Sequence, residues 1–211
     1  MAEYPITIVG CGPGHRDYVT PAARAAAAKA EVLVGAPHLL QLFDDIAATR
    51  ISVDRNITAL LDAVQQQRHR RIVVLVSGDC GLYSLAGSVQ KRFGRENCHL
   101  IPGISSLQVA CARLGLPWQD IHIISAHGRT PQIDIQHCRR AAAIAVLAGN
   151  PAACACAAAL LDELGSAYRA WSCEDLTLAQ ERVRPCSSEQ LRNETFSSRT
   201  IIIMRRDGEQ Q

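Results

Sequence analysis

Three short loops, rich in glycine and serine, carry the residues whose types and spacing are best suited to chemistry. They span residues 10–14, 77–83 and 101–106. Each follows or ends a short apolar run, which predicts a buried strand. Ligands of open α/β sheets bind beyond the carboxyl ends of the strands. The sequence therefore predicts that the three loops line one binding site.

The first loop, G-C-G-P-G, allows a sharp turn and the close approach of a ligand to its backbone. It does not fit the dinucleotide motif G-x-G-x-x-G, because His15 replaces the third glycine. The second predicted strand also ends without an acidic residue to bind a ribose. Pro13 removes one backbone donor. A nicotinamide dinucleotide is therefore disfavoured, and a tight turn without a ligand stays an alternative.

The second loop, S-G-D-C-G-L-Y, places Asp79 between two glycines at the end of a strand. Such a carboxylate could meet a cationic or hydroxyl-bearing ligand, and the alternative is a local turn stabilised by the aspartate. In the third loop, Ser105 and Ser106 lie at the start of a predicted helix. The alternative for Ser105 is simple helix capping.

The elements that position these loops alternate between strand and helix in the first half of the chain. Strands are expected at residues 6–9, 32–34, 72–76 and 99–101, and helices start near Thr20, Asn56, Tyr83 and Ser105. This alternation is typical of a parallel sheet with helical crossovers. Gly115-Leu116-Pro117 interrupts it, which predicts an α/β domain over residues 1–116 and a second over residues 117–211.

The second half predicts strands with less helix between them, and therefore a mixed sheet. Strands are expected at residues 121–125, 142–147, 167–171, 182–185 and 200–204, and helices at 134–140, 151–164 and 187–192. The predicted fold class is α/β, with a parallel sheet in the N-terminal domain and a mixed sheet in the C-terminal domain.

Composition excludes several classes of protein. The 211 residues are 48% hydrophobic with a net charge of +2, so nothing indicates a nucleic-acid partner. Nine scattered cysteines form no C-x-x-C pair, which disfavours a zinc site or a disulfide framework and favours reduced thiols of a cytoplasmic protein. No signal peptide is apparent, and no apolar run approaches the ~20 residues of a membrane helix.

Taken together, V-G-x-G-P-G, S-G-D-x-G-x-Y and P-G-I-S-S resemble the tetrapyrrole methylase family, over about residues 6–204. Residues 102–118, S-A-H-G-R at 125–129 and W-S-C-E-D-L at 171–176 resemble its CbiE branch. That branch methylates carbon 5 of a precorrin-6Y or cobalt-precorrin-7 ring in cobalamin biosynthesis. Cys80 departs from the pattern, because the family usually has proline there.

The resemblance implies a tetrapyrrole methylase fold, with the active site in the cleft between the two domains. It implies S-adenosylmethionine as cofactor, no metal held by the protein, a homodimer, and a separate CbiT-type decarboxylating methyltransferase as a possible partner. It also implies the residues that contact the cofactor: Gly10, Gly12, Pro13, Ser77, Gly78, Asp79, Leu82, Ser105, Ser106, Leu147, Ala148, Glu174 and Asp175.

The implied substrate is large, flat and rimmed with carboxylates, so cationic side chains should bind its edge. The candidates are His15, Arg16, Arg113, His127 and Arg129, and for each the alternative is a solvated surface residue. Three residues are candidates for catalysis. Asp79 would orient cofactor or substrate, and Tyr83 or His127 would accept the proton lost after methylation.

Three alternative functions stay open. The closest is a methyltransferase for another tetrapyrrole intermediate. A non-catalytic, Rossmann-type nucleotide-binding protein is disfavoured by the missing third glycine and ribose-binding acid. An RNA-modifying methylase should show a basic face, which the near-neutral charge disfavours.

Overall fold

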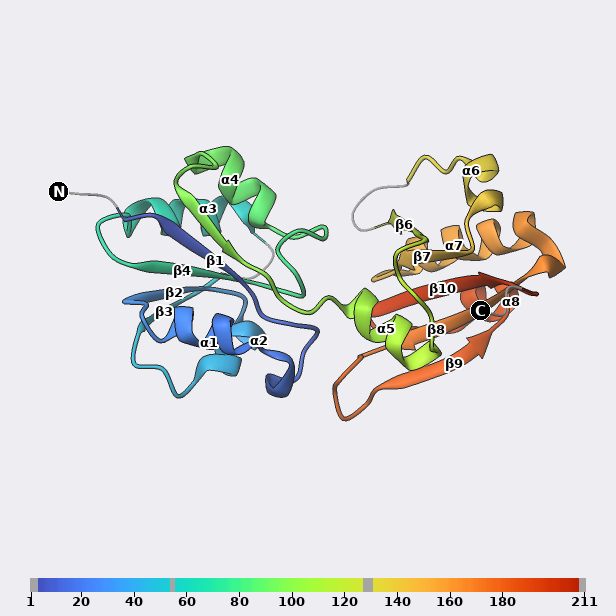
Figure 1. Ribbon diagram of the computed structural model, residues 1–211, viewed down its shortest axis with the longest axis horizontal. Helices are drawn as coiled ribbons and strands as arrows, with labels where there is room; N and C mark the ends of the chain where they lie inside the picture. The colour runs from blue at the N-terminus through green and yellow to red at the C-terminus, as the bar shows by residue number, and fades with distance from the viewer. Residues whose placement is uncertain (1–3, 54–55, 127–130, 209–211) are drawn as a thin grey trace. The chain divides into compact units, whose positions relative to one another are not determined.

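Two α/β units make up the chain in the computed structural model, which describes residues 4–53, 56–126 and 131–208 (Figure 1). The first unit is Met1–Ser105 and the second is Ser106–Gln211. Helix α5 (Ser106–Leu114) belongs to the second unit because it packs against that unit's strand β10 (Thr200–Arg206). The predicted division at residue 116 falls after this helix.

The first unit contains a five-stranded sheet in the order β3-β2-β4-β1-β5, with every neighbouring pair parallel. This confirms the predicted parallel sheet. Its strands are β1 (Ile6–Gly10), β2 (Val32–Gly35), β3 (Thr49–Ser52), β4 (Ile72–Val76) and β5 (Cys98–Ile101). Its helices are α1 (Pro21–Ala27), α2 (Pro37–Leu40), α3 (Ile57–Gln66) and α4 (Ala86–Phe93), with 3-10 turns η1 (Arg16–Tyr18) and η2 (Gln41–Phe43).

Helices cover both faces of this sheet, with α1 and α2 on one face and α3 and α4 on the other (Figure 1). Alternate residues of one strand therefore enter different cores: Val9 packs on the α1 side and Ile8 on the α3 side. This explains why the strands are uninterrupted apolar runs, as expected for parallel sheets buried on both sides.

Side-chain caps begin two of these helices where the sequence predicts them. Thr20 Oγ1 accepts from Ala23 N at 3.1 Å, and Asn56 Oδ1 accepts from Ala59 N at 3.0 Å. The helix expected from Tyr83 begins instead at Ala86. The reason is the backbone of Tyr83, whose φ of 47° is left-handed and incompatible with a helix.

The second unit contains a mixed sheet in the order β6-β7-β10-β8-β9, which confirms the predicted class. The β6–β7 pair is parallel, and the β7–β10, β10–β8 and β8–β9 pairs are antiparallel. The strands that precede β10 are β6 (Ile121–Ser125), β7 (Ala143–Leu147), β8 (Tyr168–Glu174) and β9 (Arg182–Cys186). Besides α5, the helices are α6 (Ile135–Arg140), α7 (Pro151–Leu164) and α8 (Ser188–Asn193), with the 3-10 turn η3 (Gly165–Ala167).

One face of the second sheet packs against α6, α7 and α8 in a core that includes Val146, Ile202 and Met204. Helix α7 begins at an asparagine cap, because Asn150 Oδ1 accepts from Ala153 N at 2.9 Å. Within the described ranges, no helix has the length and hydropathy needed to cross a bilayer.

Candidate functional site

The three loops meet at one edge of the first sheet. They follow β4, β1 and β5, which are neighbours in that order, and parallel strands present their carboxyl ends at the same edge. Gly78 N donates to Gly12 O at 2.9 Å, and Gly12 N donates to Gly78 O at 3.2 Å. The first and second loops are therefore joined backbone to backbone.

Glycines also allow the third loop to touch the other two. A Cβ at Gly10 would lie 2.6 Å from Gly103 N, and a Cβ at Gly103 would lie 2.3 Å from Gly78 O. Neither position has room for more than a hydrogen atom. Gly103 is a structural residue of the site that the sequence reasoning missed, although the Pro-Gly pair after a predicted strand was a signal for it.

Gly78 has a different surrounding. Its φ is +65°, and the nearest atom to an added Cβ would be Ser105 Cα at 3.8 Å. A left-handed backbone favours glycine, while the space beside it stays open. Gly78 is therefore the position where a ligand can lie directly against the backbone of the three loops.

The carboxylate of Asp79 faces backbone donors of two loops. Its Oδ1 accepts from Gly81 N at 2.7 Å, within its own loop. Its Oδ2 accepts from Gly103 N at 3.0 Å, in the third loop. The bond from Gly81 N is the local turn that the sequence gives as an alternative role for Asp79. The bond from Gly103 N is an additional contact, to a different loop, that the sequence does not predict.

Cys80, at the position where the family usually has proline, is buried, and its Sγ donates to Ile101 O at 3.2 Å. Burial, and secondarily the nearby Asp79 carboxylate, raise the pKa of the Cys80 thiol to about 11. The thiol therefore stays protonated near neutral pH and is a poor nucleophile. The Cys80 thiol thus links the second loop to the third.

Tyr83 ends the second loop, with 59% of the residue's surface exposed and with a left-handed φ of 47°. A bulky residue in this region is a true outlier, which is held in place by surrounding contacts. Ser84 supplies two of them: its Oγ donates to Cys80 O at 2.6 Å and accepts from Ala86 N at 3.2 Å. The loop thus presents an aromatic ring to the outside.

Two predicted substrate-binding residues follow the first loop. His15 caps the η1 turn, where its Nδ1 accepts from Asp17 N at 3.3 Å. Arg16 forms an ion pair with Asp44, with Nη2 to Oδ1 at 3.0 Å. Both side chains are about half exposed, so their predicted role with substrate stays a prediction.

The second unit holds the remaining predicted residues. Arg113 forms a two-point ion pair with Glu181, with 2.6 Å from Nε to Oε1 and 3.2 Å from Nη2 to Oε2. The paired guanidinium lowers the pKa of the Glu181 carboxyl. Any anion that binds Arg113 must therefore compete with this carboxylate or share the guanidinium with it.

Glu174, predicted to contact the cofactor, is buried, with 2% of its surface exposed. Its carboxylate accepts from Arg182 Nε and Nη2, each at 2.9 Å, and from Ser197 N at 3.1 Å. These contacts account for its burial without a ligand. Asp175, the next residue, has a left-handed φ of 46° and marks the end of β8.

The predicted cofactor-binding residues thus fall into two groups. Those in the three loops of the first unit are Gly10, Gly12, Pro13, Ser77, Gly78, Asp79, Leu82 and Ser105, and those in the second unit are Ser106, Leu147, Ala148, Glu174 and Asp175. Leu147 and Ala148 lie at the end of β7, as expected. His127 and Arg129 lie outside the described residues.

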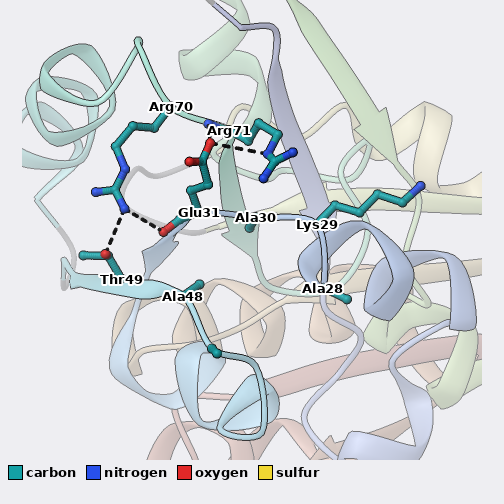
Figure 2. A pocket seen from close by; sticks show the side chains of 9 residues that line it. Ala28, Lys29, Ala30, Glu31, Ala48, Thr49, Arg70 and Arg71 are labelled. Carbon is teal, nitrogen blue, oxygen red and sulfur yellow. Dashed lines mark hydrogen bonds and ion pairs between the residues drawn. The ribbon is translucent and has the colours of Figure 1, made fainter.

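An open hollow of about 750 Å³ lies at the opposite edge of the first sheet, beside the residues that precede β2 and β4 (Figure 2). Arg70, Arg71 and Glu31 line it, and their side chains bond to other residues of the wall. Arg70 Nη2 donates to Glu31 O and to Thr49 Oγ1, and Arg71 Nε pairs with the Glu31 carboxylate at 3.3 Å. The glycine loops, and not this hollow, carry the candidate chemistry.

Residues 5–192 match the family described as Tetrapyrrole (Corrin/Porphyrin) Methylases, and the chain belongs to that family. A relative from Salmonella typhimurium named cobalt-precorrin-7 C(5)-methyltransferase is 38% identical over 124 residues. The match covers 59% of this chain and 62% of the relative's length.

Two solved structures have the same fold. Cobalamin biosynthesis precorrin-6Y methylase (cbiE) from Archaeoglobus fulgidus is 25% identical, with a TM-score of 0.73 over 96% of this chain and 98% of that one. Uroporphyrin-III C-methyl transferase from Thermus thermophilus, solved with S-adenosylhomocysteine, is 19% identical. Its TM-score is 0.77, over 95% of this chain and 96% of that one. At 19% identity, the second likeness supports the fold alone.

Proposed function

We propose that this chain is an S-adenosylmethionine-dependent C-methyltransferase that acts on carbon 5 of a precorrin or cobalt-precorrin ring in cobalamin biosynthesis. The observation that carries the proposal is the set of joined glycine loops, with an open left-handed glycine at its centre. Membership of the methylase family and the name of the Salmonella relative support the choice of reaction and ring carbon.

The residues of the loops fit an adenosine-bearing cofactor. Gly10 and Gly103 have no room for side chains, and Gly78 leaves a ligand free access to the backbone. Ser77 and Ser105 add hydroxyl groups beside these glycines. Glu174 and Asp175 are weaker candidates, because the bonds of Glu174 to Arg182 and Ser197 already satisfy its carboxylate.

The bound cofactor would supply an activated methyl group, so the chain need not supply a nucleophile. What its residues contribute is orientation, which can lower a barrier by roughly 7–11 kcal/mol when the reacting atoms are aligned. The Cys80 thiol, which is protonated and a poor nucleophile, is consistent with a reaction that needs no protein nucleophile. Tyr83, exposed beside the loops, or His127 would take up the proton that the ring carbon loses.

A carboxylate-rimmed ring would be held at its edge by cationic side chains. Arg16 and Arg113 already face carboxylates, so binding would exchange a protein carboxylate for one of the substrate. His15, His127 and Arg129 complete the proposed set. We further propose that the protein works in the cytoplasm as a homodimer, with a separate decarboxylating methyltransferase of the CbiT type as its partner.

Calorimetry with S-adenosylhomocysteine and with NAD tests the cofactor assignment. We expect micromolar binding of S-adenosylhomocysteine and no binding of NAD, because the first loop lacks the third glycine of a dinucleotide site. Binding of NAD alone would overturn the proposal.

A further inference from the structure

Asp79 links two loops that leave strands which are not neighbours. Its own loop follows β4, and the loop of Gly103 follows β5, with β1 lying between the two strands. The Oδ2–Gly103 N bond of 3.0 Å therefore reaches across the carboxyl end of β1. The other oxygen, bound to Gly81 N at 2.7 Å, fixes the direction in which the side chain points.

Cys80 also contacts the third loop, at the residue that precedes Pro102. Its Sγ lies 3.2 Å from Ile101 O, one residue before the proline, while Asp79 binds Gly103 N, one residue after it. Because its thiol stays protonated, it remains a donor. Two adjacent side chains thus fix both ends of one short turn.

We propose that Asp79 is a positioning residue, which fixes the third loop against the first two and so preserves the shape of the cofactor-binding surface. The proposal rests on the function proposed above. It assigns the carboxylate a role through Gly103 and not through contact with the reacting atoms.

Close packing makes the surface sensitive to this link. Gly10, Gly78 and Gly103 are in direct backbone contact, so a small displacement of the third loop changes the space beside Gly78. A hydrogen bond to a charged acceptor contributes more than a neutral one. Losing this bond should weaken binding of S-adenosylhomocysteine by about tenfold or more.

Asp79→Ala tests the proposal with two readouts. Hydrogen exchange of the Gly103 amide, measured without ligand, reports on the link itself, and calorimetry with S-adenosylhomocysteine reports on its consequence. The matched control is Asp134→Ala in the second unit. The Asp134 carboxylate also accepts two backbone bonds, from Gln136 N and His137 N, at the start of α6.

We expect Asp79→Ala to speed exchange at Gly103 and to weaken binding, while Asp134→Ala lowers the melting temperature without either effect. Unchanged exchange at Gly103, or faster exchange with unchanged affinity, would overturn the positioning role. If the wild-type protein itself does not bind S-adenosylhomocysteine, the proposed function fails instead. Should Asp79→Ala not fold, Asp79→Leu, which is similar in shape and also lacks both acceptor oxygens, is measured in the same way and judged by the same results.

Discussion

The glycines of the three loops differ in whether they tolerate a side chain. At Gly78, a side chain should block ligand access without preventing folding. An arginine there must adopt a φ near +65°, which costs about 1–2 kcal/mol, but it meets no atom closer than 3.8 Å at its Cβ. We therefore predict that Gly78→Arg folds and loses binding of S-adenosylhomocysteine, as measured by calorimetry.

Gly165→Arg is the matched control for this variant. Gly165 has a φ of +72°, has nothing within 4 Å of an added Cβ, and ends α7 in the second unit. It should suffer the same backbone strain and keep its affinity. If Gly78→Arg binds as tightly as Gly165→Arg, a ligand does not approach the backbone at Gly78.

The cysteines give a second prediction at this scale. Burial raises the thiol pKa of Cys11 and Cys173 to about 12 and that of Cys80 to about 11. Compared with a thiol of the usual pKa of 9.0, each of these cysteines has a thiolate fraction that is lower by roughly a hundredfold or more. In the native protein at pH 8, iodoacetamide should therefore modify these residues very slowly, which mass spectrometry of the labelled protein measures. Fast native labelling of Cys80 would contradict its assigned burial, and unfolding should make all nine thiols reactive.

At the scale of elements, the site depends on how closely the loops after β1, β4 and β5 pack. Gly103→Ala places a methyl group 2.3 Å from Gly78 O, so the third loop must move away. We predict destabilisation by about 1–3 kcal/mol in chemical denaturation, together with weaker binding of S-adenosylhomocysteine.

Gly87→Ala is the natural comparison, since Gly87 lies within α4 with nothing near an added Cβ. Helix propensity alone should make this variant more stable by about 0.5–1 kcal/mol. A Gly103→Ala protein that is as stable as wild type would show that the loops do not pack as described.

The elements differ in how well the sequence alone predicts them. The sequence predicts long periodic or apolar segments, such as β6 and α7, with their observed bounds. The reason is that apolar patterns and capping residues are signals within the segment itself. The strand β3 was missed, since its residues Thr49–Ser52 are mostly exposed at the sheet edge. The start of α4 was placed too early, because nothing local signals the left-handed φ of Tyr83.

Within the site, the sequence indicated the loops but not their contacts. Glycine motifs at strand ends were enough to predict a shared edge. The bond from Asp79 to Gly103 and that from Cys80 to Ile101 join residues more than twenty positions apart, and no periodicity records such a pairing. Likewise, the sequence does not distinguish Glu174, which is buried and paired with the exposed Arg182, from an exposed acidic residue near a ligand.

At the scale of the whole molecule, the proposed function divides the chemistry in two: a corrin precursor would supply the nucleophilic carbon, and the protein would supply alignment. A protein that only bound the cofactor would leave a corrin ring unchanged. The distinguishing property is therefore the chemical fate of the ring and not the affinity for the cofactor.

The most direct test is mass spectrometry and carbon NMR of precorrin and cobalt-precorrin intermediates after incubation with the protein and methyl-labelled S-adenosylmethionine. We predict that one labelled methyl group appears at carbon 5 of the ring, and that Gly78→Arg abolishes its appearance. A ring that stays unlabelled with a folded, cofactor-binding protein, or a label at a different ring position, would contradict the proposed function.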